Sequence, residues 1–350
     1  MRVNQPRPAL FELFPRLASG IPWLPLGWFP TPLQRVAGLC PDSVELWVKR
    51  EDQSGVVYGG NKVRKLEFVL ADALARGAKR VVTVGGIGSH HVLCTAIYGR
   101  QLGLGVEAVV FPQPLNDHVR EQILADLSVG AELRPTAGMV GVPWALWRAR
   151  RAPHTYYIPG GGSSLAGTLG YLSCGLELSR EVPFDVTYGA LGSCGMMAGL
   201  WAASCVAPGV GDVVGVRVVD RIICNRGRTK ALANKMLGAL RLRTRHQPRL
   251  TVEHGYFGGA YGRTTPAAEA AVADAAKVGL HLEPTYTGKA MAALLAHARA
   301  GKLDGKRVLF MQSYSSADLG PILRTAPAPD SLPPLLRRCF ASSPVLELAA

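Results

Sequence analysis

The sequence predicts an α/β protein of two domains, built on parallel sheets flanked by helices. Three observations support this fold class: a length of 350 residues, a composition of 48% hydrophobic and 18% charged residues, and an alternation of strand-like and helix-like segments. A chain of this length usually divides its apolar residues between two cores. The composition is that of a compact globular protein, because disordered chains contain fewer apolar residues.

The strands are predicted from short apolar or alternating runs. Residues 45–49 alternate between polar and apolar side chains, as a half-buried strand does. Residues 80–84 form a short apolar run that is typical of a buried strand. Similar runs predict further strands at residues 106–111, 185–188, 213–219 and 308–311.

The predicted helices lie between these strands. Apolar residues recur with helical spacing over residues 62–76, and Gly77 ends that helix. Further helices are predicted at residues 90–102, 117–129 and 196–205. Strands separated by helices are typical of βαβ units, which form parallel sheets. The tail after Asp318 is rich in proline and alanine, and we expect it to be irregular or loosely packed.

The net charge of +14 suggests a nucleic-acid partner at first sight. However, the basic residues are spread along the chain, and no known nucleic-acid-binding motif accompanies them. We therefore expect no nucleic-acid partner. The densest basic stretch, residues 221–249, is predicted to be a solvated helix and loop face. Alternatively, its positive potential draws an anionic cofactor or substrate towards a cleft.

Cysteine usage and hydropathy indicate the compartment. No apolar run reaches the roughly 18–20 residues that span a bilayer, and the N-terminus lacks the features of a signal peptide. The seven cysteines are scattered and form no CxxC pair, which is typical of reduced thiols in a cytosolic protein. We expect a cytoplasmic protein without a membrane partner.

The segment Gly59–Glu67 is the most informative part of the sequence. It places Lys62 on a tight glycine turn, directly where a helix begins. A lysine at such a position is either a solvated surface charge or a side chain aimed at a fixed point, as a Schiff-base lysine must be.

Two strand-to-helix junctions are rich in glycine. In the first, Gly85–His91, Ser89 is predicted to cap the next helix, whose free N–H groups attract an anion such as an amino-acid carboxylate. In the second, residues 189–196, glycines and Ser193 precede a helix and form an arrangement suited to a single phosphate. The second junction matches neither a Walker loop nor the GxGxxG fingerprint.

A third junction covers residues 283–291. Pro284 stops the preceding segment, a threonine is predicted to cap the next helix, and Tyr286 lies at the start of that helix. Tyr286 is either an acid/base or an anchor at the edge of the core. No metal site is expected, because the adjacent His90 and His91 diverge on a helix and no ligand cluster accompanies them.

Six motifs in this order resemble the 1-aminocyclopropane-1-carboxylate deaminase / D-cysteine desulfhydrase family of fold-type II pyridoxal-phosphate (PLP) enzymes. The similarity covers residues 20–318, and the run Gly-Gly-Asn-Lys-Val-Arg-Lys-Leu-Glu is highly specific. The segments that carry it are Pro30–Leu33, Lys49–Asp52, Gly59–Glu67, Gly85–Ser89, Gly192–Gly195 and Tyr286–Lys289.

The resemblance implies a two-domain architecture like that of the tryptophan synthase β subunit. The larger, PLP-binding domain would comprise residues 1–65 and 171–350, and the smaller α/β domain residues 66–170. It also implies PLP as the cofactor, a small amino acid as the substrate, and a homodimer.

The resemblance also assigns roles to residues that match the family's motifs. Lys62 would be the Schiff-base lysine, and Lys62, Ser89 and Tyr286 would be the catalytic residues. The cofactor-binding residues would be Lys62, Lys65, His90, Gly192, Ser193, Cys194, Gly195 and Thr287, with the phosphate held at 192–195 and the ring nitrogen facing Thr287. The substrate would be bound by Ser89, His90, His91 and Tyr261.

The sequence departs from the family at three positions. His90 stands where the family has an asparagine that hydrogen-bonds the phenolic oxygen of PLP. Met196 replaces a threonine of the phosphate site and removes a hydroxyl donor. Thr287 stands where the deaminases carry a glutamate, and a neutral hydroxyl cannot stabilise a protonated pyridine nitrogen as a carboxylate does.

A weaker electron sink favours elimination of a good leaving group over opening of a cyclopropane ring. The sequence therefore predicts a D-cysteine desulfhydrase-like lyase or deaminase that releases ammonia and an α-keto acid. Lys62, or Tyr286 polarised by Ser89, would remove the Cα proton. The alternatives are a 1-aminocyclopropane-1-carboxylate deaminase, an amino-acid racemase, and a catalytically divergent protein with the same fold.

Overall fold

The computed structural model describes residues 6–55 and 57–341 and folds into two compact units. Unit 1 comprises the described residues up to Ala75 together with Gly161–Ala317. Unit 2 comprises Arg76–Gly160 and the described residues from Asp318 onward. These boundaries differ from the expected ones for two reasons. Helix α2 (Lys62–Ala75) packs against α6 (Leu165–Leu178) within unit 1, and the C-terminal segment packs within unit 2.

Unit 1 contains a six-stranded sheet in the order β1-β2-β10-β7-β8-β9. All neighbouring strands are parallel except β1, which pairs antiparallel with β2 at one edge. The strands are β1 (Leu33–Val36), β2 (Glu45–Arg50), β7 (Val186–Leu191), β8 (Asp212–Arg217), β9 (Leu250–Glu253) and β10 (Arg307–Gln312).

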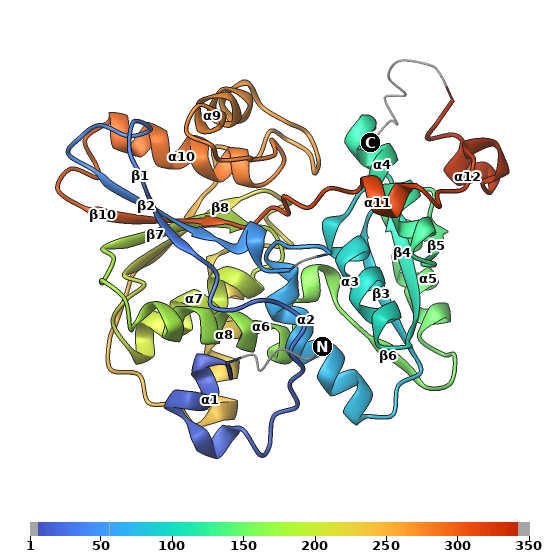
Figure 1. The fold of residues 1–350 in the computed structure, drawn as a ribbon, viewed down its shortest axis with the longest axis horizontal. Helices are drawn as coiled ribbons and strands as arrows, with labels where there is room; N and C mark the ends of the chain where they lie inside the picture. Colours follow the sequence, from blue (N-terminus) through green and yellow to red (C-terminus); the bar gives the residue numbers. More distant parts are fainter. Residues whose placement is uncertain (1–5, 56, 342–350) are drawn as a thin grey trace. The chain divides into compact units, whose positions relative to one another are not determined.

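Helices cover both faces of this sheet (Figure 1). Leu309 and Met311 of β10 face a core with α6 and α7, whereas Val308 and Phe310 face a core with α9 and α10. All four side chains are fully buried, as expected for a parallel strand covered on both faces. The helices of unit 1 other than α2 and α6 are α1 (Ala9–Leu13), α7 (Gly195–Val206), α8 (Arg226–Leu240), α9 (Pro266–Ala276) and α10 (Thr287–Arg299).

The parallel order brings several loops to one edge of the sheet. Strands β2, β10, β7, β8 and β9 all end there, and ligands of such sheets bind beyond the carboxyl ends of the strands. The segments that follow the strands include the turn before Lys62, the junction at 192–195, and the loop that carries Tyr261.

Unit 2 contains a four-stranded parallel sheet in the order β5-β4-β3-β6. Helices α3 and α4 lie on one face, and α5 packs against Val82 and Val109 on the other. The elements are β3 (Arg80–Gly86), α3 (His90–Gln101), β4 (Gly105–Phe111), α4 (Asp117–Ser128), β5 (Glu132–Pro135), α5 (Val142–Ala149) and β6 (Thr155–Tyr157).

The C-terminal tail differs from the loosely packed segment expected from its composition. It forms two short helices, α11 (Gly320–Leu323) and α12 (Pro334–Arg337). Leu332, Leu336 and Cys339 are buried against α4 and the face of the sheet that α3 covers. A few apolar side chains at irregular spacing therefore suffice to fix the described part of the tail.

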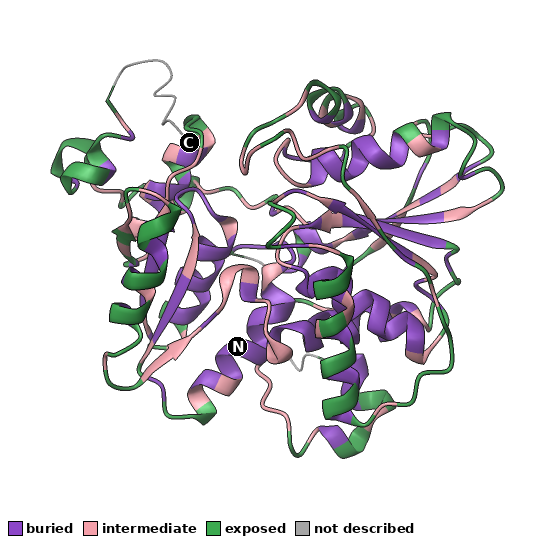
Figure 2. Ribbon diagram, turned by 180° about the vertical axis from the view of Figure 1, so that it is seen from behind, coloured by how far each residue is buried: buried purple, intermediate pink, exposed green. Residues whose placement is uncertain are grey.

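The strands and helices predicted from the sequence are all present, with ends shifted by a few residues. The sequence did not predict the short strands β1, β5, β6 and β9 or the helices α1, α5, α6 and α9. In Figure 2 the strands and the helix faces beside them are mostly buried, whereas outer helix faces and loops are exposed. The basic stretch 221–249 follows this pattern: most of its arginines are exposed, which confirms the predicted solvated face.

The tail offers a matched test of its packing. Leu336 is 1% exposed and Leu335 is 45% exposed. We expect Leu336→Ala to destabilise unit 2 by about 2–5 kcal/mol, because removal of a buried leucine leaves a cavity. Leu335→Ala should change stability by less than about 0.5 kcal/mol. Hydrogen exchange over residues 105–128 measures this in unit 2 alone, and equal protection in the two variants would contradict the packing described.

Candidate functional site

Lys62 lies at the start of α2, directly after a tight turn. Gly60 has a φ of +87°, and a Cβ at Gly59 would lie 2.1 Å from a backbone carbonyl oxygen, so both positions require glycine. The turn is tied to the end of β10 because the Asn61 N–H donates to the Ser313 carbonyl at 3.1 Å. The Lys62 ammonium donates to the Asn61 side-chain oxygen at 2.5 Å. The backbone around Lys62 is therefore fixed.

Lys65 lies one helical turn after Lys62 and is buried. Its Nζ donates to the Gly161 carbonyl at 2.9 Å and to the Ser163 hydroxyl at 3.3 Å. Burial, followed by repulsion from Lys62, lowers the pKa of Lys65 to about 7. An anion beside Lys65 would restore its positive charge.

Two serines and a helix N-terminus surround the Lys65 ammonium. The Ser163 hydroxyl donates to the Ser193 hydroxyl at 2.8 Å and accepts from the Gly195 N–H at 3.1 Å. A Cβ at Gly161 would lie 2.1 Å from the Ser193 oxygen, so the backbone there must be bare. Helix α7 begins at Gly195, and the first N–H groups of a helix have no intrahelical acceptor. This cluster, which we call the anion cup, suits a phosphate.

Cys194 and Met196 flank Gly195 in the anion cup. Cys194 is buried and has a φ of +68°, which is uncommon for a residue with a side chain. The Met196 sulfur accepts a hydrogen bond from the Asn61 side-chain amide at 3.5 Å. Met196 therefore connects the start of α7 to the turn before Lys62, and it supplies no hydroxyl.

A buried group of charges holds the opposite face of α2. Arg64 donates to the Glu51 carboxylate at 2.7 Å and pairs with Glu177 at 3.0 Å. The Tyr171 hydroxyl donates to Glu51 at 3.0 Å, and Lys49 pairs with Glu177. Burial is the largest single effect on the pKa of Glu51 and would raise it. The charge and hydrogen bond of Arg64, together with Lys49 and Thr31, outweigh burial, so the pKa is lowered.

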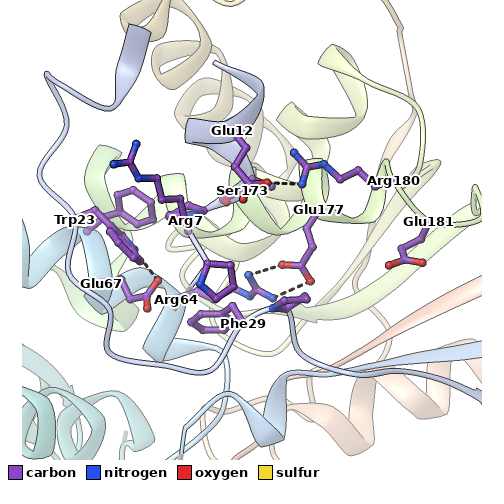
Figure 3. A pocket seen from close by; sticks show the side chains of 16 residues that line it. Arg7, Glu12, Trp23, Phe29, Arg64, Glu67, Ser173, Glu177, Arg180 and Glu181 are labelled. Atoms are coloured by element: carbon purple, nitrogen blue, oxygen red, sulfur yellow. Dashed lines mark hydrogen bonds and ion pairs between the residues drawn. The ribbon is translucent and has the colours of Figure 1, made fainter. Parts of the chain in front are cut away.

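A pocket lies beside this charged group, and Figure 3 shows its lining. Arg64 and Glu67 of α2 line it. Arg64 lies about 200° around the helix from Lys62, and Glu67 lies about 200° from Lys65. Its side chains pair with one another: Arg64 with Glu177, and the Trp23 indole N–H with Glu67 at 2.9 Å. The pocket is therefore separate from the anion cup.

Tyr261 and Tyr286 meet beyond the carboxyl edge of the sheet. Their hydroxyls are hydrogen-bonded to each other, and their rings are arranged edge to face. Burial raises the pKa of Tyr286 well above its ordinary value, and the neighbouring Tyr261 raises it further. A Cβ at Gly192 would lie 3.9 Å from the Tyr286 ring, so the tyrosine pair adjoins the anion cup.

Lys289 fixes the loop that carries Tyr261. Its Nζ donates to the Phe257 carbonyl at 2.7 Å and to the Arg263 carbonyl at 2.6 Å. The two acceptors lie on either side of Tyr261 in sequence, so one ammonium ties both arms of the loop to α10. Burial lowers the pKa of Lys289 to about 8.

The start of α10 is capped differently from the sequence-based prediction. Tyr286 is the N-cap residue and makes no side-chain capping bond, so the predicted threonine cap is wrong. Instead, the Glu283 carboxylate accepts from the N–H groups of Thr285, Tyr286 and Thr287 at 2.7–2.8 Å. The buried Thr287 hydroxyl also contacts that carboxylate, at 3.2 Å. The negative charge of Glu283 is thus engaged by a helix N-terminus.

In unit 2, Ser89 and His90 lie at the start of α3. The Ser89 hydroxyl accepts from the His91 N–H at 3.3 Å, which confirms the predicted cap. The ring of His90 stacks on that of His118, and their Nε2 atoms are 2.9 Å apart. His118 lies in the first turn of α4, so this pair was not recognisable in the sequence.

His91 is buried inside unit 2, and its surroundings differ from those of the predicted substrate-binding residue. Its Nε2 lies 2.8 Å from the Thr83 hydroxyl, and its Nδ1 lies 3.5 Å from the Thr95 hydroxyl. Both ring nitrogens are therefore used within the unit, and His91 anchors α3 to β3. Among residues 6–55 and 57–341, no three His, Cys, Asp or Glu side chains cluster as metal ligands.

The chain is similar to known proteins over most of its length. The family model described as "Pyridoxal-phosphate dependent enzyme" matches residues 24–313. A putative 1-aminocyclopropane-1-carboxylate deaminase of Pyrococcus abyssi is 33% identical over 321 residues, which cover 87% of this chain and 93% of the relative. A D-cysteine desulfhydrase of Yersinia pestis is 31% identical over 309 residues, which cover 84% of this chain and 89% of the relative.

A solved structure supports the same relationship. The crystal structure of an ACC deaminase homologue superimposes with a TM-score of 0.77 at 28% identity, covering 91% of this chain and all of that chain. Fold and motifs thus define a fold-type II PLP enzyme, which confirms the predicted fold class. The chain belongs to the pyridoxal-phosphate-dependent enzyme family, and the two relatives above are a putative deaminase and a desulfhydrase. The predicted cofactor is confirmed as well.

The residues of unit 1 fit this cofactor. The anion cup offers an ammonium, hydroxyls and helix N–H groups to a phosphate, and Lys62 lies one helical turn away from Lys65. The glycines at 161 and 195 are needed because a Cβ at either position would meet a serine hydroxyl at 2.1–2.5 Å. Lys62, Lys65, Ser193, Gly195 and Thr287 would hold the cofactor.

Sequence reasoning missed several residues of this arrangement. Ser163 follows the run Gly160–Gly162, and three successive glycines before two serines are a turn signal that could have identified it. Glu283 carries a weaker signal, an acidic residue just before a helix. His118 carried no signal, because its contact depends on the tertiary fold.

The first prediction from the site concerns the anion cup. Ser193→Asp places a negative charge next to the expected phosphate. We expect PLP affinity to fall by at least ~10-fold, because like charges a few ångströms apart in a partly dry site repel by more than ~1.4 kcal/mol. Ser193→Asn is the control, since it matches the size without the charge. Equal affinities of the two variants, measured by equilibrium dialysis, would place the phosphate elsewhere.

The second prediction uses the lowered pKa of Lys65, about 7. Below that pH the free side chain is an ammonium, and above it the side chain is neutral. Affinity for pyridoxamine phosphate, which lacks the aldehyde that reacts with Lys62, should therefore fall as pH rises from 7.5 to 9, by up to ~10-fold per unit. Lys65→Arg stays charged and should show a flatter profile. Parallel calorimetric profiles for the two proteins would refute this role.

Proposed function

We propose that this enzyme is a PLP-dependent β-eliminating lyase of the D-cysteine desulfhydrase kind. It acts on a small amino acid that carries a leaving group on Cβ, and it releases ammonia and an α-keto acid. The bound cofactor would supply the electron sink for the carbanion formed at Cα.

Thr287 carries this proposal. A hydroxyl stands where the deaminases of the family carry a carboxylate, and the nearby Glu283 carboxylate is engaged by three backbone N–H groups. A neutral partner of the ring nitrogen makes the sink weaker. A weak sink suffices for a substrate whose Cβ substituent leaves readily, whereas opening of a cyclopropane ring demands more stabilisation.

Lys62 is the base in this proposal, and Tyr286 is a proton donor. The turn before α2 fixes the backbone of Lys62, so its amine is directed at one point of the site. When the substrate is bound, this amine is free to take the Cα proton. The raised pKa of Tyr286 keeps its phenol protonated near neutral pH. That state suits donation to a leaving group, so we favour Lys62 over Tyr286 as the general base.

Ser89 and His90 are proposed to bind the substrate. Both residues lie at the N-terminus of α3, and the positive end of a helix dipole attracts an anion such as an amino-acid carboxylate. His90 pairs with His118 through two ring nitrogens, one of which must carry the proton. Where relatives have an asparagine, this chain therefore presents an imidazole that is hydrogen-bonded to a second imidazole.

We propose a cytoplasmic homodimer. All seven cysteines are free thiols, which is consistent with the proposed cytoplasmic location. Among the described residues, no helix is long and apolar enough to cross a membrane. The homodimer stays a prediction, and sedimentation velocity measures it directly.

The decisive experiment screens ammonia and keto-acid release over D- and L-cysteine, β-chloro-alanine, serine and 1-aminocyclopropane-1-carboxylate. We expect turnover of substrates with good leaving groups and at least ~100-fold lower kcat/KM on the cyclopropane. Faster turnover of the cyclopropane would instead support the deaminase. Exchange of the Cα hydrogen for deuterium without keto-acid release, on every amino acid of the panel that has a Cα hydrogen, would identify a racemase.

The control identifies the lysine. Borohydride reduction of the holoenzyme followed by peptide mapping should place the pyridoxyl group on Lys62, and Lys62→Ala should abolish keto-acid release. A pyridoxyl group on Lys65 or Lys289 would overturn the assignment. A protein that neither absorbs near ~410–430 nm nor takes up PLP would be the catalytically divergent alternative.

A further inference from the structure

Two cysteines meet beside the anion cup. Cys194 immediately precedes α7, and Cys224 lies in the loop between β8 and α8, thirty residues further along the chain. Their sulfur atoms are 2.8 Å apart, closer than the van der Waals contact of two sulfurs. The contact arises because β7 and β8 are parallel neighbours, so the segments that follow them lie side by side.

The surroundings make the two thiols unequal. A hydrogen bond from Cys224 lowers the pKa of Cys194 to about 6, and further hydrogen bonds from Thr229 and the Asn225 backbone, together with the charge of Lys65, act in the same direction. The same contact raises the pKa of Cys224. Near neutral pH the pair thus consists of a thiolate at Cys194 and a thiol at Cys224, and the thiolate is the nucleophilic form of cysteine.

Thiolate character, and not exposure, distinguishes this pair from the other cysteines. Cys194 is 7% exposed and Cys224 is fully buried. Cys194 is thus the more exposed residue of the pair, and the resolving thiol is already in contact with it. Cys40 is more exposed than Cys194, but burial of its sulfur raises its pKa to about 11. Exposure alone therefore predicts oxidation at Cys40, whereas thiolate character predicts oxidation at Cys194.

We propose that Cys194 and Cys224 are a redox-active dithiol, which hydrogen peroxide or a small organic hydroperoxide oxidises to an internal disulfide. The Cys194 thiolate attacks the terminal peroxide oxygen: an S–O bond forms and the O–O bond breaks. Hydrogen peroxide releases hydroxide, which takes a proton to become water, and an organic hydroperoxide releases an alkoxide, which takes a proton to become an alcohol. Cys224 loses its proton and attacks the resulting sulfenic acid: the S–S bond forms, the S–O bond breaks, and a water molecule leaves. The two thiols together lose two electrons, and one peroxide gains them.

The position of the pair gives this modification a consequence for the cofactor site. Cys194 lies between Ser193 and Gly195 of the anion cup, and its thiolate raises the pKa of Lys65. A disulfide removes that negative charge and ties the cup to the loop before α8. Oxidation therefore changes both the shape of the cup and the charge beside Lys65.

The test uses the holoenzyme as purified. It is treated with a slight excess of hydrogen peroxide, the remaining thiols are alkylated under denaturing conditions, and the peptides are mapped by mass spectrometry. We expect loss of two of the seven thiols and one cross-linked pair of peptides that joins Cys194 to Cys224. Oxidation that begins at Cys40, or no disulfide between 194 and 224, would overturn the proposal.

Variants identify the attacking sulfur. Cys224→Ser should stop the reaction at a sulfenic acid on Cys194, which dimedone traps, and Cys194→Ser should slow thiol loss at least ~10-fold. Cys40→Ser is the matched control and should form the disulfide at the wild-type rate. If Cys194→Ser and Cys40→Ser lose thiols equally fast, the pair is not the site of oxidation.

Discussion

The buried ion pair between Arg64 and Glu51 is the constraint on which the cofactor site depends. Burying two charges is unfavourable unless further hydrogen bonds satisfy them. Here the hydroxyls of Thr31 and Tyr171 bind Glu51, and Glu177 shares Arg64. Arg64 lies between Lys62 and Lys65 in sequence, but about 200° around α2 from Lys62 and about 100° from Lys65. A network that fixes Arg64 therefore fixes the direction in which both lysines point. Loss of one partner would leave a buried charge unpaired, so the network acts as a unit.

The site also depends on the direction of the strands: its polar and reactive side chains lie where parallel strands end. The glycine turn, the anion cup, the tyrosine pair and the thiol pair come from segments far apart in sequence. They become neighbours because β2, β10, β7, β8 and β9 run in the same direction. Each loop then needs only a local device to hold its shape. Examples are the Lys289 ammonium on the loop around Tyr261 and the Glu283 carboxylate under Tyr286.

Much of this could be predicted from the sequence, because the informative signals are local. A glycine turn at the start of a helix indicated Lys62, and a glycine-rich junction between a strand and a helix indicated the cup at Ser193. Short apolar runs indicated the central strands. The missed features depend on contacts across the fold. Ser163 reaches Ser193 over thirty residues, and Glu283 takes the capping role that a threonine was expected to play. The packing of the tail was not predicted, because composition does not show that Leu332 and Leu336 pack against apolar side chains of unit 2.

The order of strands in unit 1 has a consequence for the newly made chain. Strand β10 is among the last segments of unit 1 in sequence, yet it lies in the middle of the sheet, with β2 on one side and β7 on the other. As the ribosome releases the chain from its N-terminus, β1 and β2 emerge early, and β7, β8 and β9 follow much later. Neither group can join the other until residues 307–312 have left the exit tunnel. For most of translation the nascent sheet therefore consists of two separate parts with open apolar edges, a state in which holdase chaperones would bind.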